Sequence, residues 1–316
     1  MPNQHPQPVA WNPLAGCRQT SPGCERCYAE LWAWRFAGEG LPLEGLVRET
    51  DLGPRFTGRA VLRPEVLAWP LGRPPQVAAV CTLGDPFLEA MQEGWVLALW
   101  GVMAALPRWQ FHVSTKRPAR ARELLSRATR AACLASAAEH LPGPRERAAL
   151  QVAEHLAENR AWPPANVWLG VSVEDQARAD KRVPELVATP AALRFVAAEP
   201  LLGPVSLSRW LAPAHELPAR MGAPHGIRWV TVAGESGPAA RPMHPGHARH
   251  LRDECLQVGT AFTFKAWGQW SPAAFEVPGH QVVDCRFHGP ALVQPHRAEL
   301  VGRMLDGHLW DERPSL

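Results

Sequence analysis

The stretch "NVWLGVSVEDQARADKRVPELVATPAALRFVAAEP", residues 166–200, predicts the fold of this chain. It holds an apolar run at 166–175, a helix-like segment at 176–189 and a second apolar run at 193–200. Strands that are apolar on both faces and joined by a helix are typical of a parallel sheet covered by helices. The stretch therefore predicts a strand, a helix and a second, parallel strand.

The same alternation continues in both directions along the chain. A short first strand is expected near 8–12, further strands at 76–86, 110–118, 227–237 and 261–268, and helices at 87–106, 119–160 and 243–258. This order predicts an α/β protein built on a partial or full parallel (β/α) barrel. An open doubly wound sheet is the competing topology, but no glycine-rich dinucleotide fingerprint follows the first strand.

We expect two parts, a barrel domain over 1–270 and a C-terminal extension over 271–316 that packs on the barrel. Residues 119–160 are rich in Ala and Arg and indicate a helical insertion of two helices, broken at "LPGP" (141–144). Residues 203–226 indicate a loop with at most one short helix, and residues 296–310 a terminal helix.

The composition is that of an ordinary globular protein, with 46% hydrophobic and 20% charged residues and a net charge of +3. No apolar run approaches the roughly 18 residues that span a bilayer, and the N-terminus lacks a signal-peptide pattern. Seven cysteines, four of them scattered singly, are not a disulfide framework. We therefore expect a cytoplasmic protein without a membrane partner, in which clustered cysteines serve metal binding or catalysis.

Polar side chains follow six of the predicted strands at their C-terminal ends. In a parallel barrel these ends open on one face, where active sites form. We therefore expect a working site at this rim. Its candidate residues are Asp85, Thr115, Lys116, Arg117, Ser172, Glu174, Glu199, Glu235, Ser236 and Lys265. Asp85 precedes a proline and is equally consistent with a helix cap.

Three cysteines, Cys17, Cys24 and Cys27, lie within eleven positions of "WNPLAGCRQTSPGCERCYAE", residues 11–30. The stretch joins the first strand to a helical pattern that begins near Tyr28. The thiols are therefore expected at the same rim, beside a helix N-terminus that favours thiolates.

Two kinds of metal site suit three thiols. A structural zinc ion needs a fourth ligand, which His5, Cys81 or His112 would supply from elsewhere in the chain. A [4Fe–4S] cluster held by three cysteines leaves one iron open to bind S-adenosylmethionine, the cofactor of radical enzymes.

The chain resembles a phage-associated family of uncharacterised bacterial and phage proteins with a three-cysteine motif, which is regarded as radical-SAM-like. The resemblance covers most of the chain outside 119–165 and parts of 203–226 and 270–295. It is carried by "WNPLAGCRQTSPGCERCYAE", "TKRP", the block from 166 to 205, "WVTVAGESGPAARPMH", "FTFKAWGQW" and "GRMLDGHLWDE". The cysteine spacing is C-x6-C-x2-C, where radical SAM enzymes commonly have C-x3-C-x2-C.

The resemblance implies a radical SAM barrel, with the three cysteines on a [4Fe–4S] cluster. Thr82, Gly84 and Asp85 are then expected to bind the methionyl amino group, and Ser172 and Glu174 the ribose or carboxylate. Lys116 or Arg117 would pair with the methionyl carboxylate or a substrate phosphate. Glu199 and Glu235 would contact substrate or adenosyl, and Lys265 would do so or pair with one of those glutamates. Trp267 and Trp270 would stack a base or pack under the rim.

The expected chemistry is cleavage of S-adenosylmethionine to a 5′-deoxyadenosyl radical that abstracts a hydrogen from the substrate. A nucleic acid is the first expectation for that substrate, on the phage association of the family that the chain resembles. The basic segment 115–130 could lie on phosphates. The same segment is equally consistent with a solvated helix face. A reductant of the flavodoxin or ferredoxin type and a dedicated partner protein encoded nearby are also expected. The alternatives are a radical SAM enzyme acting on a small molecule or peptide, and a non-catalytic iron–sulfur or zinc protein that binds nucleic acid or a partner.

Overall fold

The structure is a computed structural model that describes residues 7–157, 160–214, 226–237, 239–272, 283–284, 292–295 and 303–314. Its main element is a seven-stranded parallel sheet in the order β1-β6-β7-β8-β9-β10-β11. The strands are β1 (Val9–Trp11), β6 (Val77–Val80), β7 (Gln110–Thr115), β8 (Val167–Ser172), β9 (Leu193–Ala198), β10 (Trp229–Ala233) and β11 (Ala261–Ala266). Neighbouring strands of this sheet also follow one another along the chain. This order is compatible with a partial β/α barrel.

The strands and helices predicted from the alternation are confirmed. Every residue of β9 is buried, and in β8 only Ser172 is partly exposed, which explains why both strands are apolar throughout. The main helices are α3 (Glu93–Ala105), α4 (Pro118–Arg127), α5 (Arg130–His140), α6 (Pro144–His155), α7 (Gln176–Val187) and α8 (Pro245–Val258). In the described residues, no helix is long and apolar enough to cross a membrane.

The chain groups into two compact units, each of which is described by itself. The first unit comprises 1–20, 29–170 and 188–193, and the second comprises 21–28, 171–187 and 194–316. The first therefore holds Cys17, and the second holds Cys24 and Cys27.

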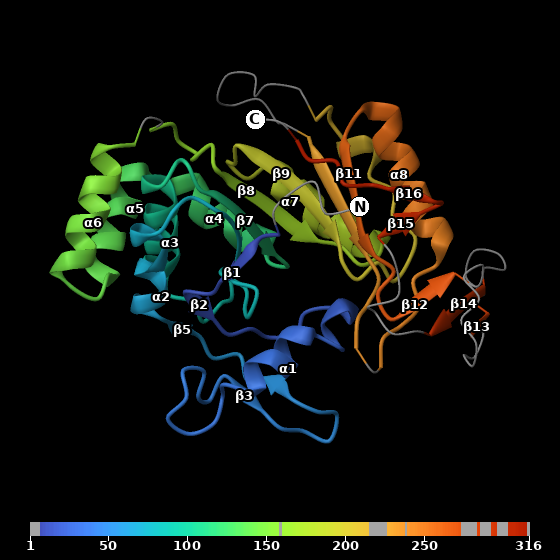
Figure 1. The fold of residues 1–316 in the computed structure, drawn as a ribbon, viewed down its shortest axis with the longest axis horizontal. Coiled ribbons are helices and arrows are strands. Elements are labelled where there is room, and N and C mark those ends of the chain that lie inside the picture. The colour runs from blue at the N-terminus through green and yellow to red at the C-terminus, as the bar shows by residue number, and fades with distance from the viewer. Residues whose placement is uncertain are drawn as a thin grey trace. The chain divides into compact units, whose positions relative to one another are not determined.

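The first unit contains the helical insertion, in which α5 and α6 pack against α3 (Figure 1). The expected two helices are three, because the chain also breaks before Thr129. The Thr129 hydroxyl accepts a hydrogen bond from the Ala132 N–H at 3.2 Å and so caps α5. Close packing of α3 on α5 requires Gly101, since a Cβ there would collide with the carbonyl oxygen of Cys133.

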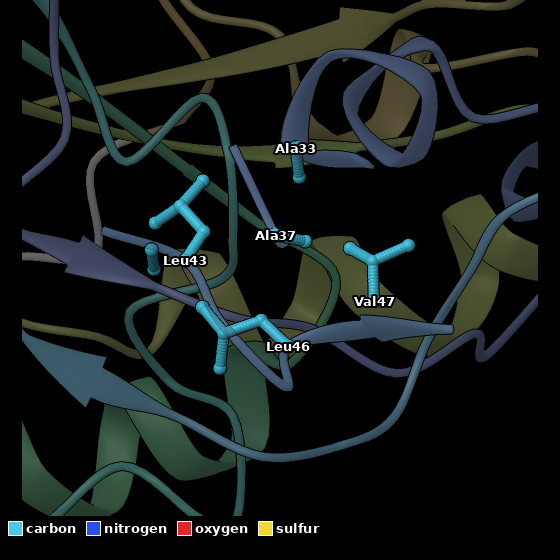
Figure 2. Close-up of a cluster of buried hydrophobic side chains, with 6 residues drawn as sticks. Ala33, Ala37, Leu43, Leu46 and Val47 are labelled. Carbon is cyan, nitrogen blue, oxygen red and sulfur yellow. The ribbon is translucent and has the colours of Figure 1, made fainter. Parts of the chain in front are cut away.

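A small apolar cluster of the first unit supports the helix that follows the cysteines, α1 (Tyr28–Trp34). Ala33 and Ala37 lie with Leu43, Leu46 and Val47 (Figure 2). Val47 begins β3 (Val47–Arg48), which pairs with β4 (Arg55–Phe56), and β2 (Leu14–Ala15) pairs with β5 (Val61–Leu62). Two short helices, α2 (Pro64–Ala68) and η2 (Trp69–Gly72), lead from β5 towards β6.

The second unit ends in short antiparallel strands and not in the expected terminal helix, which was wrong for its described part. β15 (Met304–Leu305) and β16 (His308–Leu309) form a hairpin whose turn residues Asp306 and Gly307 have φ values of 54° and 76°. An Asp-Gly pair suits such a turn, because both positions need positive φ. Residues 296–302 of the expected helix lie outside the described residues.

Other parts of the C-terminal segment are also described. β12 (Trp270–Pro272) and β13 (Val283–Asp284) pair with β14 (Leu292–Pro295). Beyond the hairpin, the Phe264 N–H donates to the Trp310 carbonyl at 2.9 Å, and the Glu312 N–H donates to the Phe262 carbonyl at 3.2 Å. These bonds attach the end of the chain to β11. The loop expected at 203–226 contains η3 (Ser208–Trp210), and its residues 215–225 lie outside the described part.

Candidate functional site

Asp85 is the centre of a buried polar cluster in the first unit. Its carboxylate accepts four hydrogen bonds, from the Thr115 hydroxyl at 2.7 Å, the Lys116 N–H at 3.0 Å, Arg117 Nη1 at 3.1 Å and the Phe87 N–H at 3.0 Å. The cluster thereby joins the loop after β6 to the end of β7. Asp85 does not cap a helix, because α3 begins only at Glu93 with Gln92 as its cap.

Arg117 connects this cluster to the first cysteine. Its Nη1 lies 3.9 Å from Cys17 Sγ, Nη2 donates to the Arg18 carbonyl at 2.9 Å, and Nε contacts the exposed Glu89 carboxylate at 3.1 Å. Burial opposes the charge of Arg117, but the charges of Asp85, Cys17 and Glu89 outweigh it and raise the pKa of the guanidinium. Arg117 therefore stays a cation next to Cys17.

Close backbone contact holds the start of the cysteine loop against the loop after β6. The Gly16 N–H donates to the Leu83 carbonyl at 3.2 Å, and the Asp85 N–H donates to the Gly16 carbonyl at 3.2 Å. A Cβ on Gly84 would lie 2.6 Å from the Gly16 oxygen, so only glycine fits there. Thr82 is held by Asn12, whose Oδ1 accepts from its hydroxyl at 3.1 Å.

In the second unit, the rest of the cysteine loop is attached to the residues after β8. η1 (Pro22–Cys24) carries Gly23, whose N–H donates to Glu174 Oε1 at 3.4 Å. Arg182 of α7 binds the other Glu174 oxygen at 2.8 Å and the Ser172 carbonyl at 2.8 Å. Glu174 and Arg182 are both buried, so this ion pair orders the strand end.

A second ion pair in the same unit, between buried Glu235 and half-buried Arg241, reaches the cysteine loop from the end of β10. The Glu235 carboxylate is bound by Arg241 through Nη2 at 2.7 Å and Nε at 3.0 Å. The same guanidinium donates to the Pro22 carbonyl at 2.8 Å and to Glu25 at 2.9 Å. The hydrogen bond to Glu235 is the main reason that the pKa of Arg241 is raised, against the opposing effect of burial.

Glu199 and Lys265 form an ion pair, with Lys265 Nζ 2.7 Å from Glu199 Oε1. This is one of the two roles predicted for Lys265. The Thr231 hydroxyl also donates to Glu199. Trp267 is buried and donates from Nε1 to the Met304 carbonyl at 3.0 Å, and Trp270 donates to the Ala240 carbonyl at 2.6 Å. Trp267 thus packs under the strand ends and presents no face for a base.

None of the six cysteines that the structure describes is in a disulfide. Cys24 is buried, while Cys17 and Cys27 are half-buried; Ser21 Oγ lies 3.7 Å from Cys24 Sγ. Burial raises the pKa of Cys81 and of Cys133 to about 12. Within the described ranges, no three His, Cys, Asp or Glu side chains are gathered as a bound metal ion would need. Of the suggested fourth ligands, His112 stacks on Trp168 and His5 lies outside the described residues.

The predicted residues therefore fall into clusters in each unit. The first unit joins Asp85, Thr115, Lys116 and Arg117 with the loop that bears Cys17. The second joins Glu174 and Glu235 with the loop that bears Cys24 and Cys27, while Glu199 and Lys265 form a separate pair. Sequence reasoning missed the partners Glu25, Glu89, Arg182 and Arg241. No local rule marks these partners, because even Glu235 and Arg241 are six residues apart, beyond the three- or four-residue spacing of helix side-chain pairs.

Together these features define an α/β protein with a parallel sheet and a cysteine-bearing loop bound to residues that follow its strands. The chain belongs to the family described as "Protein of unknown function (DUF5131)", whose model matches residues 7–314. Comparisons with the curated proteins and with the solved structures give no match.

Proposed function

We propose that this protein is a radical S-adenosylmethionine enzyme of the phage-associated, three-cysteine type that its motifs resemble. The observation that carries the proposal is the loop with Cys17, Cys24 and Cys27, three thiols within eleven residues that follow β1 and β2 and that form no disulfide. Thiolates are the ligands of iron–sulfur clusters, so the chemistry of this donor set fits a [4Fe–4S] cluster. Cys17, Cys24 and Cys27 would hold the cluster, which would bind and reduce S-adenosylmethionine.

Once bound, such a cluster would supply the electron for reductive cleavage of S-adenosylmethionine. The protein's own residues orient the cofactor and the loop. We assign cofactor contacts to Thr82, Gly84, Ser172 and Glu174, and substrate contacts to Lys116, Glu199 and Lys265. Asp85 and Glu235 act as positioning residues through Arg117 and Arg241, because both guanidiniums also bind carbonyl oxygens of the cysteine loop.

The proposed substrate is a nucleic acid, with electrons from a flavodoxin- or ferredoxin-type donor and a dedicated protein partner. The basic segment 115–130 gives this substrate little support, because Arg120 and Arg127 on α4 bind groups of the protein itself. A cytoplasmic location suits the proposal, since a cluster ligated by thiolates needs them reduced.

The test is anaerobic reconstitution with iron and sulfide, followed by dithionite and S-adenosylmethionine, with 5′-deoxyadenosine measured by mass spectrometry. We expect cluster absorbance and 5′-deoxyadenosine from the native chain, and neither from Cys17→Ala, Cys24→Ala or Cys27→Ala. Cys133→Ala is the matched control, because this buried cysteine lies outside the motif and should leave iron uptake unchanged.

Tight zinc binding without iron uptake would contradict the proposal and would leave a structural or binding role. Cluster formation with no 5′-deoxyadenosine, even with nucleic acid and reductant added, would favour a non-catalytic iron–sulfur protein. Cleavage that responds to a small molecule or a peptide and not to nucleic acid would keep the enzyme class and replace the substrate.

A further inference from the structure

The first unit contains a pocket of about 450 Å³ next to the residue that follows Cys17. The hairpin β3–β4 forms one wall, and Arg18 and Gln19 of the cysteine loop form another. The lining residues that bear on its chemistry are Arg18, Arg48, Thr50, Asp51, Arg55 and Phe56. Three arginines against one aspartate make the lining positive.

The arginines are placed in a way that costs stability unless an anion is present. Arg48 and Arg55 lie directly opposite each other in the β3–β4 register, and like charges in this position repel. Glu30 relieves part of the repulsion, because its buried carboxylate lies 3.1 Å from Arg55. In the part of the chain that the structure describes, no carboxylate lies within ion-pair distance of Arg48 or Arg18.

Arg18 is held at the pocket by the anchoring of the cysteine loop. Its carbonyl accepts from Arg117, and the neighbouring Cys17 carbonyl accepts from the Gly58 N–H at 3.1 Å. The Arg18 side chain lies over Gly58, where a Cβ would come within 3.4 Å of its Nε. The same loop therefore carries both a proposed cluster ligand and a wall of the positive pocket.

We propose that this pocket binds the phosphate group of a nucleotide, either within a single nucleic-acid strand or as a free nucleotide. Guanidinium groups match phosphate oxygens in pairs and bind them better than any other side chain. The volume suits a nucleotide-sized group, since ligand pockets span about 300–1,000 Å³. The inference rests on the proposed function only in making this ligand the substrate; the phosphate site stands on its own geometry.

Exposed aromatic residues of the first unit favour a single nucleic-acid strand, and not a free nucleotide, as the molecule that carries the phosphate. Trp32 is 52% and Phe36 45% exposed, and Arg35 lies over the Trp32 ring at 4.7 Å. Successive bases of a single strand stack on exposed aromatic faces while cationic side chains bind the backbone. A free nucleotide would have no use for this second surface.

The experiment measures binding of a fluorescein-labelled 20-nucleotide single strand by anisotropy, using protein purified without iron. Arg48→Glu is compared with Arg145→Glu, a charge reversal at an exposed arginine of α6 in the same unit. We expect Arg48→Glu to weaken binding about tenfold and to lower the slope of log K against log salt by about one. Arg145→Glu should change the affinity less than twofold. A cooperative thermal transition in both variants verifies that they fold, and Arg48→Gln should give an intermediate loss of binding.

Competition with the labelled strand shows whether the phosphate belongs to a free nucleotide or to a nucleic-acid strand. Displacement of the strand by millimolar AMP or inorganic phosphate indicates a free nucleotide, and resistance to both indicates a strand; either result supports the phosphate site. Equal effects of Arg48→Glu and Arg145→Glu, or no salt-dependent binding, would overturn it. If Arg48→Glu weakens binding but no 5′-deoxyadenosine forms in the native protein, the phosphate site stands and the proposed enzyme class fails.

Discussion

At the scale of single residues, the two units have the same kind of ion pair at their strand ends. A buried carboxylate, Asp85 in one unit and Glu235 in the other, holds an arginine that also binds carbonyl oxygens of the cysteine loop. Buried charges of this kind are costly when one partner is removed. The pairs therefore keep the loop in one conformation and make it sensitive to single substitutions.

Asp85→Asn should lower the free energy of unfolding by about 3 kcal/mol. The asparagine removes the charge that Arg117 faces and turns an amide donor towards the Thr115 hydroxyl or the Lys116 N–H. Urea unfolding measures the loss. Glu89→Gln is the matched control, because Glu89 binds the same guanidinium with a side chain that is 70% exposed; its effect should be below about 1 kcal/mol. Equal losses in the two variants would show that the Asp85 cluster has no special role.

Glu30 makes stability depend on pH. Burial raises the pKa of its carboxyl above the ordinary value of 4.5, although the Phe56 N–H and Arg55 lower it in part. The folded state then holds a proton that the unfolded state has lost, so the contribution of Glu30 falls as pH rises above about 4.5. Glu30→Gln lacks this titration. The free energy of unfolding of Glu30→Gln relative to that of the native protein should therefore be higher at pH 8 than at pH 5, as measured by chemical unfolding. A difference between the two proteins that is constant with pH would contradict this.

At the scale of elements, the helical insertion of the first unit depends on a close crossing of α3 and α5. The hydroxyl of Ser136 on α5 donates to the Gly94 carbonyl on α3 at 2.7 Å. About two helical turns further along α3, Gly101 lies against the backbone of Cys133 on α5. Alanine and arginine suit the helices of this region, but their periodicity does not show where a glycine must sit. The break before Thr129 was not predicted for a similar reason. A threonine can be recognised as an N-cap only when the start of the helix that follows it is known.

Gly101→Ala should therefore be destabilising although alanine is the better helix former. The added methyl group meets the backbone of Cys133, which cannot move without separating the two helices. We expect a loss of about 2–3 kcal/mol in the free energy of unfolding, which is typical of overpacking. At Gly94 the nearest atom is Cε1 of the His140 side chain at 3.1 Å. Gly94→Ala should therefore stay within about 1 kcal/mol of the native protein, and an equal loss there would refute the packing argument.

At the scale of the whole molecule, the described sheet order follows the order of the chain, with α3 between β6 and β7, α7 between β8 and β9, and α8 between β10 and β11. A bound cluster would add to the stability of this fold, since a ligand that binds only the folded state raises its free energy of unfolding. The protein's thermal midpoint is therefore a second readout of the proposed cofactor, independent of catalysis.

Anaerobic loading with iron and sulfide should raise the midpoint of thermal unfolding by about 5 °C or more. The rise should be absent in a Cys17→Ala/Cys24→Ala double variant, whose remaining thiol cannot hold a cluster. Cys133→Ala lowers the starting midpoint, because it opens a small cavity in α5, but it should keep the full rise. The same increase in the double variant would show that iron binds elsewhere.

The sequence by itself determined the order and kind of the main elements and the grouping of three thiols after the first strand. Both depend on local features, namely the periodicity of apolar residues and the spacing of cysteines. Only the tertiary structure decided the pairing of Asp85 with Arg117 and of Arg48 with Arg55. It also decided the Asp306–Gly307 hairpin where a helix was expected. Charged side chains near strand ends have many compatible partners, and the choice among them depends on chain closure and packing, which no local pattern encodes.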